Sequence, residues 1–386
     1  MNDTSGCAKN VHYGDILVKF GESISAEKAD LPFICEREIL KKLSKSILKN
    51  GDVVIADTAE DMTTGKSCEI VDVDECMPVL AGLHTIPVRP KQKFGKYYLG
   101  YYLNSEAFHS QLIPLIQGIK VYSISKSSIK DTVVMFPDDV QEQEKIGSLF
   151  NRIDNTITLQ QRKLNSLQKL KKGLLQKMFP KNGENIPEIR FPEFSDAWKQ
   201  CKLSDLVNVI DGDRGKNYPT EADFEPHGHT LFLNASNVTI DGFLFDTNQF
   251  ITEEKSNSMG SGKIIKDDII ITSRGSLGHI AWYNDSVQQV MPHLRINSGM
   301  LILRNKANVK TSYLHQFMKS DKGKAQIVFM SFGSAQPQLT KKGVESFTVN
   351  YPMDTEEQIK IGAFFSKLDN TITLQQRWLF YTHKQS

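Results

Sequence analysis

The chain has 386 residues, of which 39% are hydrophobic and 24% charged, and its formal net charge at pH 7 is +2. This composition is typical of a globular protein with room for two domains, and a nearly neutral chain can bind nucleic acid only through a local basic face. We find no signal peptide and no apolar run long enough to span a bilayer, so the sequence predicts a cytoplasmic protein. The five cysteines form no CxxC pair and have no histidine at zinc-binding spacing, which indicates free thiols and no metal site.

The first block of the sequence, up to about Pro137, predicts a mixed α/β domain. Strand-like runs are separated by Gly, Asp and Lys, and Tyr97–Ile116 has apolar spacing compatible with helices. The strand-like runs are Asp15–Phe20, Asp52–Ala56, Cys68–Val73, Leu83–Val88 and Thr132–Phe136.

The stretch Gln141–Pro180 predicts one long helix. Apolar residues recur at every seventh position in two series, which describes a narrow apolar seam that packs against another helix. No proline interrupts the run before Pro180, so a helix of roughly 35 residues and ~50 Å is expected. Gln160 and Lys171 interrupt the seam, and such polar positions help to fix register and partner. The two series are Ile146, Ile153, Leu167 and Leu174, and Phe150, Ile157, Leu164 and Met178.

A surface connector and a second α/β block follow. The connector has two prolines and mixed charges, and the second block runs from about Trp198 to Pro352. A helix is expected over Ser312–Phe329. Strands are expected at Thr230–Leu233, Asp268–Ser273, His279–Trp282, Met300–Leu303 and Ser346–Tyr351.

The long helix occurs twice. Glu357–Arg377 repeats Glu142–Arg162 at an offset of 215 residues, and the nine-residue segment DNTITLQQR is identical in both copies. The seam residues Ile361, Phe365, Leu368 and Ile372 restate the two series. Such a match indicates duplication of a domain-plus-helix unit. We therefore expect two divergent domains whose helices pair in antiparallel directions.

Several motifs resemble those of the specificity subunits of type I restriction-modification systems, and the resemblance extends over nearly the whole chain. The motifs, besides the two copies of DNTITLQQR, are VHYGDILVKFG (Val11–Gly21), ADTAED (Ala56–Asp61), AGLHTIPVRP (Ala81–Pro90), LQKMFP (Leu175–Pro180), PEIRFPEFSDAWKQCKL (Pro187–Leu203), DGDRGKNYP (Asp211–Pro219) and GSAQPQLTK (Gly333–Lys341).

This resemblance implies an α/β (α+β) fold. It has two target-recognition domains with mixed and antiparallel sheets, separated by an antiparallel two-helix coiled-coil spacer with pseudo-twofold symmetry. It also implies double-stranded DNA, two methyltransferase subunits and restriction subunits as partners. Family members carry no catalytic site, so S-adenosylmethionine and ATP with Mg²⁺ are expected in the partner subunits and no cofactor in this chain.

The resemblance sets the expected domain boundaries. Residues 1–138 form the first target-recognition domain, 139–180 the central spacer helix, 181–197 the connector, 198–353 the second domain and 354–386 the C-terminal spacer helix. The first domain lacks the lead-in Pro187–Leu206 of the second and is expected to be N-terminally truncated. The second helix is expected to be shortened, because Arg377 is followed by WLFYTHKQS instead of the continuation of the first copy.

Motifs for catalysis are missing from the sequence. Gly65-Lys66-Ser67 resembles the end of a nucleotide-binding P-loop, but Glu60 stands where its first glycine belongs. The chain has no Asn-Pro-Pro-aromatic loop of an amino-methyltransferase, no HExxH and no GxSxG. We therefore predict a chain that is not an enzyme.

Three loops of the second block are candidates for DNA contact. Glycines let a backbone approach phosphates, arginine can read guanine, and asparagine or glutamine can read adenine. Solvated turns and a plain hairpin are the alternative interpretations. The candidate residues are Arg214, Lys216, Asn217, Tyr218, Arg274, Ser276, Gln336 and Gln338.

The first block has weaker candidates. Lys91 and Lys93 alternate with aromatic residues, a pattern compatible with phosphate contacts, although a solvated basic face is the favoured alternative. His84 and Arg89 suit DNA contact and the capping of strand ends equally well.

These observations lead to one main hypothesis and two alternatives. The chain is expected to be a DNA specificity subunit whose two domains each recognise one half of a bipartite target and direct the partner subunits. The alternatives are a truncated, inactive remnant and a helical scaffold that binds proteins instead of DNA.

Overall fold

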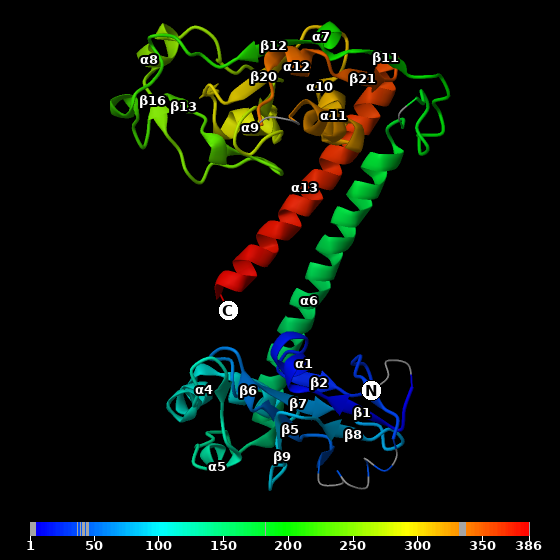
Figure 1. Cartoon of the computed structure of the whole chain (residues 1–386), viewed down its shortest axis with the longest axis vertical. Helices are drawn as coiled ribbons and strands as arrows, with labels where there is room; N and C mark the ends of the chain where they lie inside the picture. Colours follow the sequence, from blue (N-terminus) through cyan, green and yellow to red (C-terminus); the bar gives the residue numbers. More distant parts are fainter. Residues whose placement is uncertain are drawn as a thin grey trace. The chain divides into compact units, whose positions relative to one another are not determined.

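The computed structural model describes residues 5–36, 38, 40, 43, 46–181, 183–331 and 337–385. The chain divides into two compact units, Met1–Leu159 and Gln160–Ser386, and each is described by itself. Figure 1 labels the elements of both units.

The first unit contains two four-stranded sheets with helices beside them. One sheet has the order β3-β1-β8-β4 with β1 and β8 parallel, and the other has the order β2-β7-β5-β9 with β2 and β7 parallel. The strands are β1 (Ala8–Val11), β2 (Ser23–Ser25), β3 (Phe33–Ile34), β4 (Ile47–Leu48), β5 (Val53–Ala56), β6 (Thr58–Ala59), β7 (Ser67–Val71), β8 (Val79–Ala81), β9 (Thr85–Val88) and β10 (Tyr122–Ser123). The helices are α1 (Tyr13–Val18), α3 (Tyr98–Asn104), α4 (Glu106–Leu112), η2 (Ile113–Leu115), α5 (Lys126–Ile129) and the first part of α6 (Val140–Lys177).

The core of the first unit lies on both faces of strand β5. Side chains alternate along a strand, so Val54 and Ala56 face one hydrophobic cluster while Val53 and Ile55 face the cluster under α3 and α4. Ile146 of α6 packs against this second cluster, which ties the start of the long helix to the domain.

Two strand predictions in the first block are wrong. Asp15–Phe20 lies mostly in helix α1, where the His12 side chain accepts a hydrogen bond from Gly14 N and caps the first turn. Thr132–Phe136 forms no strand, because its backbone amides bond to side chains instead of a neighbouring strand. The runs at β5, β7 and β9 are confirmed.

The second unit is built around an antiparallel sheet of order β12-β20-β17-β18. A second sheet has the order β16-β13-β19, and the pairs β11–β21 and β14–β15 complete the strands. The strands are β11 (Lys199–Lys202), β12 (Val207–Asp211), β13 (Thr230–Phe232), β14 (Val238–Thr239), β15 (Gly242–Phe243), β16 (Phe250–Ile251), β17 (Ile269–Thr272), β18 (Ile280–Trp282), β19 (Leu294–Arg295), β20 (Met300–Asn305) and β21 (Thr348–Tyr351). The helices are α7 (Leu203–Leu206), η3 (Glu221–Asp223), η4 (Ala235–Asn237), α8 (Glu253–Ser258), α9 (Asp285–Val290), α10 (Thr311–Lys319), α11 (Asp321–Ser331), α12 (Lys341–Glu345), α13 (Thr355–Gln385) and the end of α6.

The two units share a topology. Strand β5 pairs antiparallel with β7 and β9, as β17 does with β18 and β20. Strand β1 has an antiparallel neighbour, β3, and a parallel one, β8, as β13 has β16 and β19. The duplication seen in the long helices therefore extends through both domains.

Hydrogen bonds at the start of each long helix repeat this duplication. The buried Gln143 side chain accepts from Gly95 N at 2.9 Å and donates to a backbone carbonyl of the preceding segment. Gln358 accepts from Lys310 N at 2.7 Å and donates to the corresponding carbonyl. Each glutamine fixes the direction in which its helix leaves its domain.

Within the second unit, the end of α6 and helix α13 run in opposite directions side by side (Figure 1). Gln375 Nε2 donates to Gln160 Oε1 at 2.7 Å, and Phe365 stacks on Phe179 at a centroid distance of 6.2 Å. Lys171 forms an ion pair with Asp369 between these two contacts. The numbers rise along one helix as they fall along the other, as the sequence predicts.

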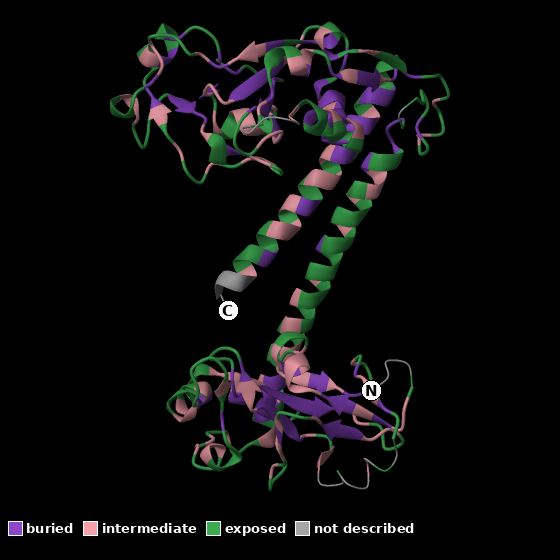
Figure 2. Cartoon of the chain, viewed as in Figure 1, coloured by how far each residue is buried: buried purple, intermediate pink, exposed green. Residues whose placement is uncertain are grey.

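The predicted seam residues have different surroundings along the helices. Phe150 contacts the ring of Tyr101, while Ile361 and Phe365 belong to the core of the second domain. Farther along, Leu164 and Ile372 are buried, while Leu167, Leu368 and Ile157 are half-buried. Ile153 is 45% exposed in the single chain. Figure 2 shows the buried start of α13 and the more exposed turns that follow.

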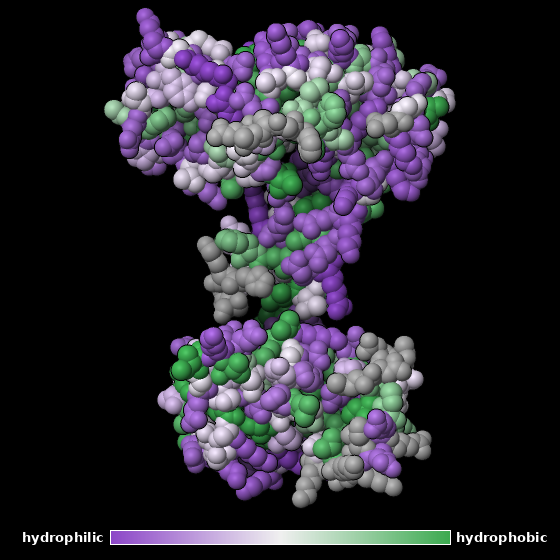
Figure 3. All heavy atoms as spheres, in the orientation of Figure 1, coloured by the Kyte–Doolittle hydropathy of each residue, from purple (hydrophilic) through white to green (hydrophobic). Residues whose placement is uncertain are grey.

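Hydrophilic side chains cover most of the visible face of the second domain (Figure 3). Among the helices that the structure describes, none is both long and apolar enough to cross a membrane.

Candidate nucleic-acid interface

The DNA-contact candidates of the second domain gather around one frame of backbone hydrogen bonds. Ser273 N donates to Gly299 O at 2.7 Å, and Leu339 N donates to Ser273 O at 3.0 Å. These bonds join the end of β17, the start of β20 and the segment before α12. We call the segments 211–218, 273–278, 297–299 and 337–340 the second loop corner.

The loop 211–218 packs tightly against this frame. Gly212 approaches Asn297 so closely that an added Cβ would lie 2.1 Å from the Asn297 carbonyl oxygen, so only glycine fits there. The Asp213 carboxylate accepts from Gly215 N and Gly260 N, each at 2.7 Å, and these two bonds lower the pKa of Asp213. The loop is therefore held in shape by its own acidic residue.

The predicted side chains of that loop are partly engaged. Asn217 Nδ2 donates to Ser258 O at 2.7 Å, and the Tyr218 ring packs edge-on against Phe232. Arg214 Nη2 donates to Ser298 O at 3.3 Å, yet its side chain remains 53% exposed. Lys216 is exposed. Asn217 and Tyr218 thus shape the loop, while Lys216 and Arg214, whose guanidinium also lies 3.9 Å from the Asp211 carboxylate, remain exposed.

Arg274 and Gln338 come from separate loops and meet in the corner. Arg274 Nε donates to Gln338 Oε1 at 3.0 Å, and the exposed guanidinium keeps its two terminal nitrogens without a partner among the residues described. Ser276 is exposed, and its carbonyl accepts from the Thr272 hydroxyl. Gln336 lies outside the described residues.

A buried arginine that the sequence analysis missed lies under the corner. Arg295 is 2% exposed and donates to Ser261 O at 2.6 Å and to the Ser256 hydroxyl at 3.1 Å. Burial lowers its pKa, and Asp213 partly offsets the cost of the buried charge. The surrounding residues, MPHLRIN (291–297), carry no pattern that distinguishes a buried arginine from a surface one.

The first domain has the same backbone frame. Asp57 N donates to His84 O at 3.1 Å, and Ile124 N donates to Asp57 O at 2.9 Å. We call the segments 57–66, 82–84 and 122–124, with the start of α1, the first loop corner. His84 contacts Asp57 at 3.4 Å and the Tyr13 ring edge-on, and its side chain is 59% exposed.

The side chains on the two frames differ. Relative to the shared frame, Thr58 of the first corner takes the position of Arg274 in the second. Likewise, Ser123 takes the position of Gln338. The sequence analysis missed Thr58 and Ser123, although aligning the two halves at the 215-residue offset would have pointed to Ser123.

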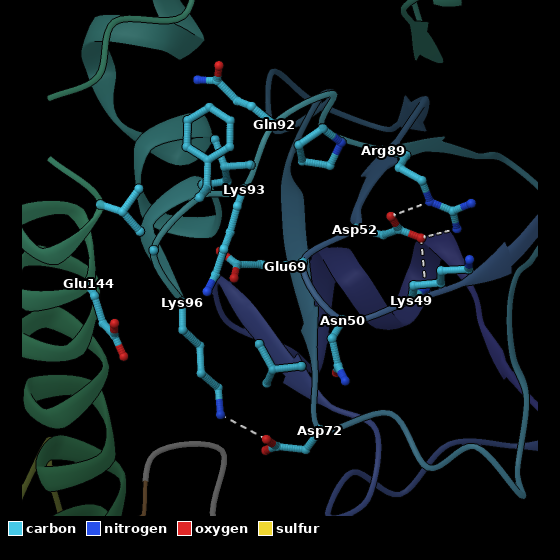
Figure 4. A pocket seen from close by; sticks show the side chains of 17 residues that line it. Lys49, Asn50, Asp52, Glu69, Asp72, Arg89, Gln92, Lys93, Lys96 and Glu144 are labelled. Atoms are coloured by element: carbon cyan, nitrogen blue, oxygen red, sulfur yellow. Dashed lines mark hydrogen bonds and ion pairs between the residues drawn. The ribbon is translucent and has the colours of Figure 1, made fainter. Parts of the chain in front are cut away.

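Arg89 lies at the opposite end of strand β9 from His84. It donates to both carboxylate oxygens of Asp52, at 2.8 and 2.6 Å, and Figure 4 shows this pair at the rim of a cavity of about 680 Å³. Arg304 forms the same bidentate pair with Asp268 in the second domain, at 2.9 and 2.7 Å. The repeat of this pair indicates that it holds each sheet in shape.

The two lysine candidates lie on the Arg89 side of the first domain. Lys93 lines the same cavity as Arg89, and Lys91 is exposed nearby in the chain. The structure therefore does not bring His84 together with Arg89, Lys91 and Lys93, whereas it does bring together the described candidates of the second domain.

No group of three or more His, Cys, Asp or Glu side chains among the described residues is arranged to hold a metal ion. The loop corners present cations, amides and hydroxyls together with the carboxylates of Asp57, Asp61, Asp211 and Asp213.

Comparisons with known proteins agree on one family. A family model described as the type I restriction modification DNA specificity domain matches residues 13–169 and 195–379. The putative type I restriction enzyme MjaX specificity subunit of Methanocaldococcus jannaschii is 24% identical over 374 residues, which cover 92% of this chain and 81% of that protein. The type I restriction enzyme MjaVIII specificity subunit of the same organism is 21% identical over 268 residues, which cover 68% of this chain and 61% of that protein.

A solved structure shares the fold. The crystal structure of a type I restriction-modification system S subunit from M. genitalium matches with a TM-score of 0.58 at 15% identity, covering 98% of this chain and 86% of that chain.

Proposed function

Because the chain belongs to the family of type I restriction-modification DNA specificity domains, we propose that each of its two domains reads one half of a bipartite DNA target. The reading surface of each domain is its loop corner, and the long helices link the two domains.

One observation carries this proposal: the two corners share a backbone frame but differ in side chains. Ser273, Gly299 and Leu339 repeat the hydrogen bonds of Asp57, His84 and Ile124. Sequence readout depends on side chains at base edges, so two unlike sets on one frame suit two unlike half-sites.

Arg274 is the residue that we expect to read a base. Its Nε is bound by Gln338, which orients the guanidinium and leaves two terminal nitrogens for the O6 and N7 acceptors of guanine. Arg214 and Lys216 provide the positive charge that holds the adjacent phosphates. In the first domain, His84 lies on the corresponding frame.

Catalysis belongs to partner subunits in this proposal. Two methyltransferase subunits supply methyl transfer with S-adenosylmethionine, and restriction subunits supply cleavage driven by ATP and Mg²⁺. The absence of nucleotide-binding and methyltransferase motifs from the sequence supports a chain that only recognises DNA. Methyl transfer to DNA by the purified chain alone would contradict this part of the proposal.

The experiment is methylome sequencing of cells that carry this chain and its cognate methyltransferase subunit. The wild type should give a motif of two half-sites separated by unread base pairs. Arg274→Ala should relax one base position in one half-site and weaken binding of the target by about 1–3 kcal/mol. The other half-site should stay as it was.

Two matched variants complete this test. Thr58→Ala, at the equivalent position of the first corner, should alter only the other half-site. Lys169→Ala, on an exposed face of α6, should alter neither. Weaker methylation by Arg274→Ala at an unchanged motif would assign Arg274 to a phosphate and overturn its role in base reading.

A further inference from the structure

A second basic site lies behind the second loop corner, in a pocket of about 510 Å³. The end of α6, the start of α11 and the loop between β17 and β18 line it. Gly278, at φ +78°, packs against Ile327 of α11 so closely that an added Cβ would lie 2.6 Å from it. This contact brings the loop that carries Arg274 against α11 and closes one side of the pocket.

The polar lining of the pocket is mainly basic. Four lysines line it against two aspartates, which leaves an excess of positive charge. These residues, which we call the lysine pocket, are Lys171, Lys172, Lys319, Lys324, Asp241 and Asp321.

Lys319 distinguishes this pocket from an ordinary charged surface. The residue is only 9% exposed, and within the described part of the chain its ammonium has no hydrogen-bond acceptor and no ion-pair partner. Asp241 and Asp369 act on it electrostatically, but Asp369 is already paired with Lys171. The Lys319 Nζ is not among the fully buried unpartnered atoms, so the ammonium is reachable from the pocket. A largely desolvated charge without a partner is costly unless a ligand compensates it.

The internal duplication shows that the fold does not need a cation at this position. Lys319 is the last residue of α10, as Asn104 is the last residue of α3, and the next residue of each, a serine, caps its helix in the same way. The Asn104 amide exchanges hydrogen bonds with the backbone of Ser67 at 3.0 and 2.7 Å. At this position the first domain has Asn104, a neutral side chain with hydrogen-bond partners. The second domain has Lys319, a charged side chain without one.

We propose that the lysine pocket binds a phosphate group. Lysine ammonium groups are common phosphate ligands, and Lys319 supplies the buried charge while Lys172 and Lys324 are exposed at the rim. Leu277, Gly278 and His279 line the pocket directly after the Arg274–Ser276 segment, so a backbone phosphate of bound DNA is within reach of the same loop. A free phosphorylated small molecule presents the same chemistry.

Only the DNA source of the phosphate rests on the proposed function. Burial, with the neighbouring Lys171, lowers the pKa of Lys319 to about 8, which leaves its ammonium mostly charged at pH 7 and available to an anion.

The test compares the full-length wild type with Lys319→Asn, which copies the first domain, and with Lys169→Asn as a charge-matched control. Inorganic phosphate, titrated at constant ionic strength against chloride, should raise the melting temperature of the wild type and of Lys169→Asn. The Lys319→Asn variant should bind phosphate at least tenfold more weakly. Lys172→Asn, at the exposed rim, should weaken phosphate binding by a smaller factor.

A second arm identifies the source of the phosphate. The salt dependence of binding to a target duplex should become shallower by about one unit of log–log slope in Lys319→Asn, with the recognised bases unchanged. An unchanged slope together with lost phosphate binding would assign the pocket to a free phosphorylated molecule and overturn the DNA source.

The two arms also separate this proposal from the proposed function. Equal effects of phosphate on the wild type and Lys319→Asn, or no effect on the wild type, would overturn the pocket itself. Arg274→Ala, which alters base reading, should leave the phosphate titration unchanged. Loss of DNA reading and loss of the pocket are therefore seen in different measurements.

Discussion

Two arginines of the second domain lie at opposite ends of its central sheet and have opposite surroundings. Arg304 forms a bidentate pair with Asp268, which is 1% exposed, while Arg274 is exposed and bonds only to Gln338 among the described residues. The first arginine compensates a buried charge and the second presents free donors. Residue type alone does not separate these roles, because both arginines belong to loops or strand ends.

At the residue scale, the Arg304–Asp268 pair should be structural. Arg304→Ala leaves the buried Asp268 carboxylate without its partner, so we expect the free energy of unfolding of the second unit to fall by about 3 kcal/mol. The three tryptophans, Trp198, Trp282 and Trp378, all lie in that unit, so denaturant unfolding followed by their fluorescence measures it.

The duplication provides the control for Arg304. Arg89→Ala removes the equivalent pair with Asp52 from the first unit. This variant should leave the tryptophan-detected unfolding transition of the second unit unchanged. It should lower the stability of the first unit, which limited proteolysis measures. A tryptophan transition that Arg304→Ala does not shift would contradict the structural role.

Lys319 should also leave a signature in the pH dependence of stability. Its pKa in the folded chain is about 8, below the ordinary value of 10.5, so between these values the unfolded chain binds a proton that the folded chain does not. The free energy of unfolding should therefore rise with pH across this window, by on the order of 3 kcal/mol. Below pH 8 the folded chain carries the whole cost of the buried charge.

The Lys319→Asn variant isolates this contribution. It should be more stable than the wild type at pH 7, and the difference should disappear as the pH approaches 10.5. The measurement is tryptophan-detected denaturation of both proteins across the pH range. A constant difference between them would show that Lys319 is not desolvated in the folded chain.

At the element scale, the two copies of the helix motif meet at equivalent residues. Gln160 and Gln375 occupy the same position of the repeat, and their side chains bond to each other at 2.7 Å. In an antiparallel pair of equivalent helices, a residue meets its own counterpart only where the helices cross symmetrically. The identical segment DNTITLQQR thus contains the position that sets the register of the pair.

A double-mutant cycle tests this register contact. Gln375→Leu should lower the stability of the second unit by about 1 kcal/mol, because Gln160 loses its partner in a half-buried seam. Adding Gln160→Leu should recover that loss, since an apolar pair suits a helix seam. Thermal unfolding followed by circular dichroism measures both effects. Additive losses in the double variant would show that the two residues are not in contact.

At the scale of the whole molecule, the duplication separates what stays constant from what varies. The helices and the backbone frames repeat, while the side chains of the loop corners differ. In the proposed function, the repeated parts set distance and geometry, and the divergent side chains of the loop corners recognise the bases. This division explains how one architecture can serve two unlike half-sites.

The length of α6 should set the number of unread base pairs. Four residues inserted after Gln161 add ~6 Å of helix. This length corresponds to roughly two base pairs. Methylome sequencing should report a longer gap between unchanged half-sites. The same insertion after Gly183, in the connector, should leave the gap as in the wild type. An unchanged gap in an active Gln161 insertion variant would refute the role of α6 as a spacer.

Sequence reasoning recovered the two long helices and the longer central strands, such as β5, β17 and β20, but missed most of the short strands and misread two runs. Asp15–Phe20 has the β-branched composition of a strand, yet a capping side chain starts a helix there. Thr132–Phe136 lacks a strand partner. The Gln111 and Tyr102 side chains accept hydrogen bonds from two of its backbone amides. In both cases side-chain hydrogen bonds outweighed local propensity.

The duplication and the long helices could be read from the chain alone, because identity and periodicity are properties of the sequence, and the pseudo-twofold symmetry expected of a tandem repeat gave their opposite directions. Packing, by contrast, brings Arg274 to Gln338, places Arg89 and His84 at opposite ends of a strand, and buries Lys319 without a hydrogen-bond or ion-pair partner among the described residues. These facts depend on contacts between residues far apart in the chain, and such contacts are set by the packing of whole elements.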